Sequence, residues 1–502
     1  MRAVEPRVEE SGLGEGLGQG LGRRAVHGAA VTVVGQGAKV LLQTLSVIIL
    51  ARLLSPSDYG LFAMVMAVAG VAEIFRDFGL SQAAVQAKTL SREQRDQLFW
   101  INTAIGVVLA LSVYFGAWLI AAFFRHDELV PLIQALSLVF LVNGAATQFR
   151  ASLTRSLRFT ALAVIDFLST VVGLAAAIAF ALSGFGVWSL VLQVLISSLV
   201  VLLASVICSR WLPGRPRRGT QIGGFLRFGW HMVATQVVTY VGNNADTVTI
   251  GLVFGAAPLG NYNRPYQLVM NIANQLRSPI SNVAIPVLSR LQDAGAKYWE
   301  FARVGQLALG YTLVAGLAVA TGAAVPITDI LLGHEWVASA PILSMLSAAA
   351  IFQTLAYFGY WIYVSKGITK ALFKFNLVGV GVKVVFLVVG AFWGVNGVAA
   401  GYLISTFLKW PLSLYWIARS VEQVPIRMFV TGFLRMSALA GLGAASAFLA
   451  TVLLANQGRW AQVLVAMAAA VLVYALGLFV PAVRRDVADL LSAASRLRKK
   501  QL

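Results

Sequence analysis

The chain has 502 residues, of which 59% are hydrophobic and only 12% are charged, and its mean hydropathy is +0.79. Soluble domains have about 45–50% apolar and about 25% charged residues, so this composition excludes an ordinary soluble protein. The net charge of +19 lies in short hydrophilic segments between apolar runs, which favours anionic membrane lipids over nucleic acid as partners. The single cysteine, Cys208, excludes an internal disulfide, and the scattered histidines indicate neither a metal site nor a cofactor.

Long apolar runs follow one another along the chain, and a membrane core about 30 Å thick requires about 20 such residues per helix. Runs of this length favour helices over the alternating strands of a barrel, because a helix satisfies its own backbone hydrogen bonds. The sequence therefore predicts an all-α polytopic membrane protein with about 14 transmembrane helices. The predicted spans are residues 26–53, 60–86, 98–124, 131–149, 160–182, 187–209, 229–254, 262–288, 304–325, 339–363, 373–393, 396–418, 432–455 and 460–481.

Lysine and arginine are concentrated in every second connection between the predicted spans. If the N-terminus is cytoplasmic, the cytoplasmic segments hold 28 of these residues and the opposite side holds 4. This alternation follows the positive-inside rule and predicts that both termini are cytoplasmic. Connections longer than about 20 residues are absent from this assignment. The sequence therefore leaves no room for a soluble catalytic domain and predicts no catalytic residues.

The order of the spans predicts two pseudo-symmetric six-helix bundles followed by two additional helices. Tyr59-Gly60-Leu61-Phe62 aligns with Leu259-Gly260-Asn261-Tyr262, 200 positions later, and both segments lie at an outer turn. Parallel repeats of this kind are typical of transporters with a central site between the repeats. The predicted division is a disordered cytoplasmic N-terminus without a signal-peptide cleavage site (1–25), an N-terminal bundle (26–210), a cytoplasmic linker (211–222), a C-terminal bundle (223–418), two helices (419–481) and a basic amphipathic tail on the cytoplasmic leaflet (482–502).

Charged residues inside the predicted spans are candidates for function, since each costs roughly 2.5–3.5 kcal/mol to insert. Glu73, Arg76 and Asp77 stand at i, i+3 and i+4, so they form either a self-neutralising cluster or part of a site. Lys39 and Lys383 have no helical carboxylate neighbour within one turn. They suit an anionic ligand, or they pair with Asp77 or Asp246 across helices, and the sequence leaves both possibilities open.

The seventh and eighth spans each carry a polar stripe when residues are placed at 100° intervals. Facing stripes would line a water-filled cavity, whereas the alternative is hydrogen bonding between helices in a dry bundle. Val241 and Ile272 fall on the opposite, apolar faces. The stripes contain Thr235, Gln236, Thr239, Tyr240, Asn243, Asp246 and Thr247 in the seventh span, and Asn263, Gln267, Asn271, Asn274, Arg277, Ser278, Ser281 and Asn282 in the eighth.

Several short motifs are similar to those of a known transporter family. The segments ARLLSP (51–56), DYG (58–60) and DFGLS (77–81) resemble the N-terminal motifs of the polysaccharide transporters, the Wzx-type flippases of the MOP superfamily. Asn244-x-Asp246, the segment LGNYNRPY (259–266) and the segment PVLSRLQD (286–293) resemble motifs of the C-terminal half, with Pro265 as a departure from the family pattern. The resemblance covers roughly residues 26–480.

The resemblance implies two six-helix bundles that work by alternating access on an oligosaccharide linked to a polyprenyl diphosphate. Such a protein would serve surface polysaccharide (lipopolysaccharide) or exopolysaccharide biosynthesis in the bacterial cytoplasmic membrane, alongside polysaccharide polymerase and chain-length proteins. The intramembrane cations would hold the diphosphate, the polar stripes would meet sugar hydroxyls, and Asp246, Asp77 or Glu73 would couple an ion. The residues that would bind substrate are Lys39, Arg76, Asn243, Arg264, Asn271, Asn274, Arg277 and Lys383.

Two other functions compete with this interpretation. A multidrug exporter of the same superfamily would need a more apolar or anionic cavity for cationic drugs, and the cations in the middle of the spans argue against it. A membrane polysaccharide polymerase or ligase is expected to carry a large extracytoplasmic loop, which the predicted topology lacks.

Overall fold

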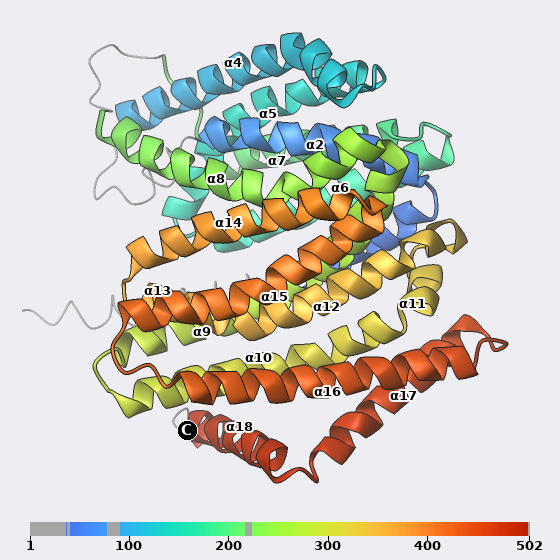
Figure 1. The fold of residues 1–502 in the computed structure, drawn as a ribbon. Helices are drawn as coiled ribbons and strands as arrows, with labels where there is room; N and C mark the ends of the chain where they lie inside the picture. Colours follow the sequence, from blue (N-terminus) through green and yellow to red (C-terminus); the bar gives the residue numbers. More distant parts are fainter. Residues whose placement is uncertain (1–36, 38–40, 78–90, 216–222, 500–502) are drawn as a thin grey trace, which may run out of the picture.

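The structure, a computed structural model, describes residue 37 and residues 41–77, 91–215 and 223–499. This part of the chain is helical and contains no strand, which confirms the predicted all-α membrane class. The long helices run roughly along one common direction (Figure 1). Their length follows from the apolar runs, in which the helix is the local structure that leaves no backbone group unpaired in lipid.

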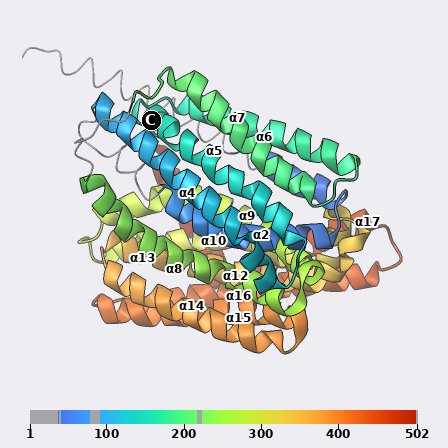
Figure 2. The same ribbon diagram turned by 90° about the horizontal axis from the view of Figure 1, so that it is seen from above.

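The described part of the N-terminal half consists of a short apolar helix, Leu41–Ala51, and five long helices. Ser91 and Gln94 form a capping box at the start of α4, which explains why this helix begins there. Helices α4 to α7 lie together on one side of the molecule (Figure 2). The long helices are α2 (Pro56–Asp77), α4 (Arg92–Phe124), α5 (Leu129–Arg155), α6 (Phe159–Leu182) and α7 (Trp188–Ser209).

The C-terminal half contains two of the longest helices, one of which, α9, includes Pro265, Pro279 and Pro286. A short 3₁₀-helix and two short α-helices interrupt the other spans of this half. Its elements are α8 (Gly223–Phe254), α9 (Ala256–Arg290), α10 (Ala296–Gly322), α11 (Ala324–Leu331), η1 (His334–Ser339), α12 (Ala340–Ala356), α13 (Phe358–Ser365), α14 (Thr369–Ala391) and α15 (Gly394–Ser420).

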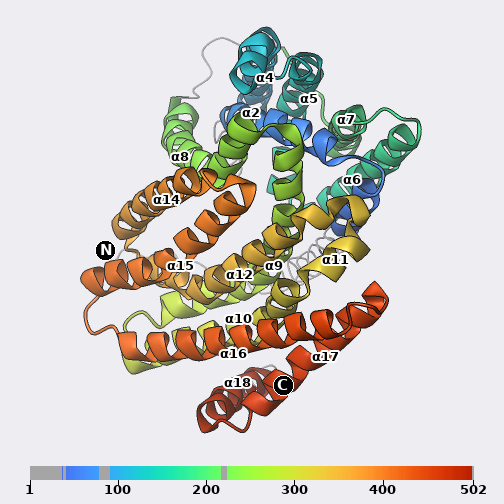
Figure 3. The same cartoon turned by 45° about the vertical axis from the view of Figure 1, so that its right-hand side comes forward.

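Three further helices, α16 (Ile426–Leu453), α17 (Arg459–Gly477) and α18 (Pro481–Lys499), lie at the outer edge of the C-terminal half (Figure 3). Val483 of α18 is buried and Leu490 packs against the apolar cluster of this half, whereas Leu491 is 67% exposed. Part of the predicted amphipathic face of the tail therefore contacts protein. Contact of the tail with the cytoplasmic leaflet stays a prediction.

Ten helical segments of the described chain are long and apolar enough to cross a membrane. Three other helices, α8, α9 and α15, are 32, 35 and 27 residues long but are not among the ten. The reason is visible in α9, where the predicted polar stripe lowers the mean hydropathy of a helix of sufficient length. The predicted count of fourteen is not established by composition alone, because helices that line a polar site lose the signal used to recognise them.

The two halves approach each other closely where the first turns of α2 and α9 cross. A Cβ atom added to Gly60 would lie 1.7 Å from the carbonyl oxygen of Ala256, and one added to Gly260 would lie 1.8 Å from that of Pro56. Both glycines and both partners are 200 positions apart, so the contact is reciprocal, as expected of an internal repeat. The absence of a side chain on each glycine is what lets the two backbones come this close.

Candidate functional site

A buried ion pair joins α8 to α14 in the C-terminal half. Asp246 is 1% exposed, and its Oδ1 lies 3.6 Å from Nζ of Lys383, which is 5% exposed. The lysine also donates hydrogen bonds to the carbonyl oxygens of Gly242 at 3.0 Å and Asn243 at 3.3 Å. The second carboxylate oxygen of Asp246 accepts a hydrogen bond from Tyr262 at 2.8 Å. Pairing removes much of the cost of burying either charge alone.

Three tyrosines from α9 and α15 form an aromatic wall beside this pair. Tyr262 stacks on Tyr266 with ring centres 6.0 Å apart, and Tyr266 meets Tyr402 edge to face at 5.8 Å. Nζ of Lys383 lies 4.9 Å from the centre of the Tyr402 ring. Aromatic faces attract cations, so Tyr402 adds to the oxygen atoms that hold the ammonium group.

Arg277, in the middle of α9, is held by neutral partners. Its side chain is buried, and it donates hydrogen bonds to the carbonyl oxygen of Ala273 at 3.0 Å, to Asn274 at 3.1 Å and to Gln353 of α12 at 3.0 Å. The guanidinium carbon lies 5.2 Å from the centre of the Tyr357 ring. Among the described residues, no carboxylate lies within 4 Å of it. The cation is thus positioned without being neutralised, and it does not pair with Asp246, whose partner is Lys383.

Arg264 lies at the contact between the halves, away from these groups. Its guanidinium carbon is 3.3 Å from the centre of the Tyr59 ring of α2, and its Nη1 donates to Gln267 at 3.0 Å. Gln267 in turn donates to Asn263 at 2.7 Å. The side chain is 5% exposed, so in this structure Arg264, a predicted substrate-binding residue, is enclosed by protein.

The predicted cluster of Glu73, Arg76 and Asp77 at the end of α2 lies only partly within the described residues. Nε of Arg76 donates to Glu73 at 2.8 Å, and Nη1 of Arg76 contacts the carbonyl oxygen of Asn143 at 3.2 Å and the hydroxyl of Thr147. The side chain of Asp77 and all of Lys39 lie outside the described residues. In the described part, Arg76 is therefore matched by Glu73 and anchors α2 to α5.

The polar stripes of α8 and α9 are only partly exposed. Asn243, Asn271 and Asn274 are exposed, while the side chains of Thr235 and Thr239 lie outside the described residues. Val241 and Ile272, on the predicted apolar faces, are also exposed, by 54% and 40%. Exposure alone therefore does not separate the two faces, because the surface of a membrane protein is exposed to lipid as well as to water.

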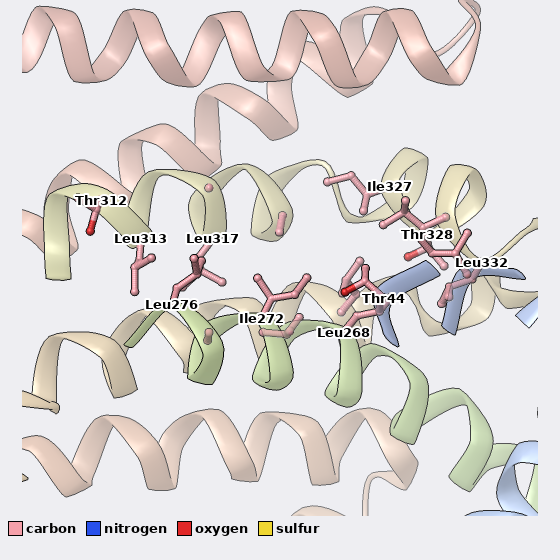
Figure 4. Close-up of a pocket in the computed structure, with 17 residues that line it drawn as sticks. Thr44, Leu268, Ile272, Leu276, Thr312, Leu313, Leu317, Ile327, Thr328 and Leu332 are labelled. Atoms are coloured by element: carbon pink, nitrogen blue, oxygen red, sulfur yellow. The ribbon is translucent and has the colours of Figure 1, made fainter. Parts of the chain in front are cut away.

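An apolar cavity of about 380 Å³ opens on the α9 face that carries Leu268, Ile272 and Leu276. Its other walls are α10, α11, α12 and the short helix 41–51, which contributes Thr44 from the N-terminal half (Figure 4). Arg277 does not line this cavity, because Leu268 and Ile272 lie on the opposite side of α9 from Arg277.

The residues that contact the predicted charges from other helices were missed by sequence analysis. Gln353 and Tyr357 lie next to Arg277, and Tyr402 lies next to Lys383. The available signal was weak, because Gln353 and Tyr402 stand in largely apolar runs and Tyr357 is one of several aromatic residues in 357–363. Residues on different helices share no periodicity that would bring them together in a sequence pattern.

Solved structures with the same arrangement of helices belong to membrane transporters. The lipid II flippase MurJ in an inward closed conformation is 15% identical, covers 89% of this chain and 99% of its own, and has a TM-score of 0.69. A multidrug resistance MATE family transporter of the MOP superfamily is also 15% identical, covers 80% of this chain and 95% of its own, and has a TM-score of 0.58. At this identity the likeness establishes the fold.

Sequence relatives connect the chain with polysaccharide biosynthesis. The lipopolysaccharide biosynthesis protein WzxC of Escherichia coli (strain K12) is 24% identical over 80% of this chain and 81% of its own length. The succinoglycan biosynthesis transport protein ExoT of Rhizobium meliloti (strain 1021) is 25% identical over 61% and 62%. The family model described as polysaccharide biosynthesis protein matches residues 49–341, more than half of the chain. The motifs and this match agree, and the chain belongs to the polysaccharide biosynthesis protein family of multi-pass membrane proteins.

Proposed function

We propose that this protein moves an oligosaccharide linked to a polyprenyl diphosphate across the bacterial cytoplasmic membrane by alternating access, for surface polysaccharide or exopolysaccharide biosynthesis. The observation that carries the proposal is Arg277, a buried cation without a carboxylate partner among the described residues. A diphosphate bears at least two negative charges, and its passage through hydrocarbon without a counter-charge is prohibitive. A guanidinium group binds phosphate oxygens through two parallel hydrogen bonds.

The apolar cavity on the opposite face of α9 from Arg277 supports a lipid-linked substrate. A substrate with a charged group and a polyprenyl chain requires both a cationic site and an apolar surface. Leu268, Ile272 and Leu276 supply that surface within the three turns of α9 that precede Arg277. The exposed side chains of Asn271 and Asn274 offer hydrogen bonds to sugar hydroxyls.

We assign Asp246 to coupling and Lys383 to the control of Asp246. Oδ1 of Asp246 has no hydrogen-bond donor among the described residues, and the ammonium group of Lys383 is 3.6 Å away. Separation of the pair would free the carboxylate to take up a proton or another cation. Each charge that moves inward across the membrane gains roughly 2.3 kcal/mol per 100 mV, which can drive the cycle.

The test is deletion of the gene in its host, followed by measurement of surface polysaccharide and of lipid-linked oligosaccharide in the membrane. We expect the polysaccharide to be lost and the lipid-linked precursor to accumulate, and the intact gene to restore export. If the deletion leaves the polysaccharide unchanged but increases sensitivity to cationic drugs, the assignment as a flippase is wrong and a multidrug exporter is favoured. Reporter fusions at Leu502 test the cytoplasmic position of the C-terminus.

A further inference from the structure

A basic pocket lies in the N-terminal half, between the start of α4 and the end of α7. It has a volume of about 610 Å³ and is lined by three arginines, Arg92, Arg95 and Arg210, together with Trp211 and Leu212. The distribution of lysine and arginine predicts that this end of the N-terminal half lies at the cytoplasmic surface of the membrane. We propose that this pocket binds the phosphate group of an anionic phospholipid headgroup, and this proposal does not rest on the transported substrate.

The charges around the pocket leave an excess of cations. Arg92, Arg95 and Arg210 form no ion pair within the described chain. Two carboxylates, Glu93 and Asp96, lie beside them on α4. Asp96 is only 8% exposed, and its Oδ1 accepts a hydrogen bond from Nε1 of Trp211 at 3.1 Å. The neutral indole positions Asp96 without removing its charge, so three guanidinium groups beside two carboxylates leave one net positive charge for an anionic ligand.

Arg95 is fixed in place but not fully satisfied. Its guanidinium carbon lies 4.3 Å from the centre of the Trp211 ring, which orients the planar group. Its buried Nε has no hydrogen-bond acceptor among the described residues. A buried donor without an acceptor destabilises the protein, and a phosphate oxygen in the pocket would remove that penalty. This is a second observation, independent of the charge, that indicates an anion.

Apolar residues next to the pocket favour a lipid over a free phosphate ion. Leu199, Leu203 and Ile207 of α7 are exposed at intervals of four residues, so they form one stripe that ends one turn before Arg210. Leu212, in the wall of the pocket, is 71% exposed. A phospholipid bound with its phosphate among the arginines could lay an acyl chain along this stripe. The cytoplasmic leaflet is also the leaflet with the negative surface potential.

The test compares the thermal stability of the purified full-length protein in detergent with added phosphatidylglycerol, phosphatidylcholine or inorganic phosphate at equal concentration. We expect phosphatidylglycerol to raise the Tm and the other two to have little effect. In Arg92→Gln/Arg210→Gln, which changes two exposed side chains, at least half of that rise should be lost. Arg95→Lys retains the charge without the guanidinium fork and should lose a smaller part.

Arg290→Gln/Lys297→Gln is the matched control, because it removes the same charge from exposed positions at the corresponding end of the C-terminal half. It should retain the full response to phosphatidylglycerol. Native mass spectrometry should count fewer retained phosphatidylglycerol molecules on the pocket variant than on the control. An equal response of both double variants would overturn the proposal, since the effect would then be general charge attraction. Equal stabilisation by inorganic phosphate would indicate that the ligand is a free anion and not a lipid, and this result would also overturn the proposal.

Discussion

Asp246 and Asp486 are both buried carboxylates of the C-terminal part, 1% and 0% exposed, yet their charges are satisfied to different degrees. Asp486 of α18 accepts hydrogen bonds from Arg303 at 2.8 Å and Arg435 at 3.0 Å, and a third from Tyr311 at 3.3 Å. Asp246 has one hydrogen-bond donor, Tyr262, and one ammonium group at 3.6 Å.

The difference indicates which region forms a permanent contact and which region can rearrange its ion pairs. In the tail region, Arg303 and Arg435 are balanced by Asp486 and by Asp489, which lies 2.9 Å from Arg303. The central groups Arg277, Lys383 and Asp246 together leave one positive charge. A buried carboxylate held by several donors keeps two elements together, whereas one with few partners can exchange them at low cost. Docking of α18 is therefore structural, and the central region is suited to bind and release an anion.

The largest effect is expected at Arg277, where the comparison predicts loss of function without loss of the protein. Arg277→Ala should reduce export on the order of 100-fold, equivalent to about 2.7 kcal/mol for a charge-assisted contact with phosphate. Arg277→Lys should retain part of the activity, because it keeps the charge but loses the two-pronged contact. Export is measured as surface polysaccharide at equal protein level in the membrane. Arg290→Ala, at the exposed end of the same helix, is the control, and wild-type export by Arg277→Ala would contradict the assignment.

The contact between the halves provides the next test. Gly60→Ala places a methyl group 1.7 Å from the carbonyl oxygen of Ala256, so α2 and α9 must separate. We expect export to fall on the order of tenfold, since the halves can no longer close at this end. In Gly441→Ala, in α16, the new Cβ would meet nothing within 4 Å, and the helix should gain up to about 1 kcal/mol. Equal activity of the two variants would show that this contact is not part of the transport cycle.

In the tail, the comparison predicts that substitutions lower the stability of the protein and do not remove a group that binds the substrate or the driving ion. Asp486→Asn leaves Arg303 and Arg435 facing each other without their shared carboxylate, which should cost about 3 kcal/mol. Asp489→Asn should cost less than about 1 kcal/mol, because Asp489 is 43% exposed and pairs with Arg303 alone. The Tm in detergent and protease cleavage after Val480 measure both. If Asp489→Asn destabilises as much as Asp486→Asn, burial is not what strengthens this network.

Sequence periodicity was sufficient to place Arg277, Asn274 and Asn271 on one face of a helix, because the residues of one helix share a fixed angular interval. It was insufficient to pair Lys383 with Asp246, which lie on α14 and α8 and are more than 130 positions apart. The choice between an anionic ligand and a carboxylate partner for Lys383 depends on how these helices pack. Similarly, the apolar face of the tail was recognisable, but its docking through Asp486 depends on arginines of α10 and α16.

A double-mutant cycle on the central pair separates its structural role from its role in coupling. Asp246→Asn and Lys383→Met should each lower the Tm, and the double variant should recover part of the loss, with a coupling energy of about 1–2 kcal/mol. Export should not recover in the double variant, since the carboxylate that would take up the driving ion is missing. Recovery of both stability and gradient-driven export would show that Asp246 serves only to neutralise Lys383.

The smallest effect concerns water access along α8 and α9. After Cys208→Ser, single cysteines at Asn243 and Asn274 should react with a small charged thiol reagent about tenfold faster than cysteines at Val241 and Ile272. The static exposures, 54% for Val241 and 40% for Ile272, would by themselves predict similar rates. The difference is expected because a thiol must ionise to react, and apolar surroundings such as the cavity at Ile272 oppose ionisation. Equal rates at all four positions would mean that the cavity at Ile272 is filled with water. That result would remove the apolar surface that the proposed polyprenyl chain requires.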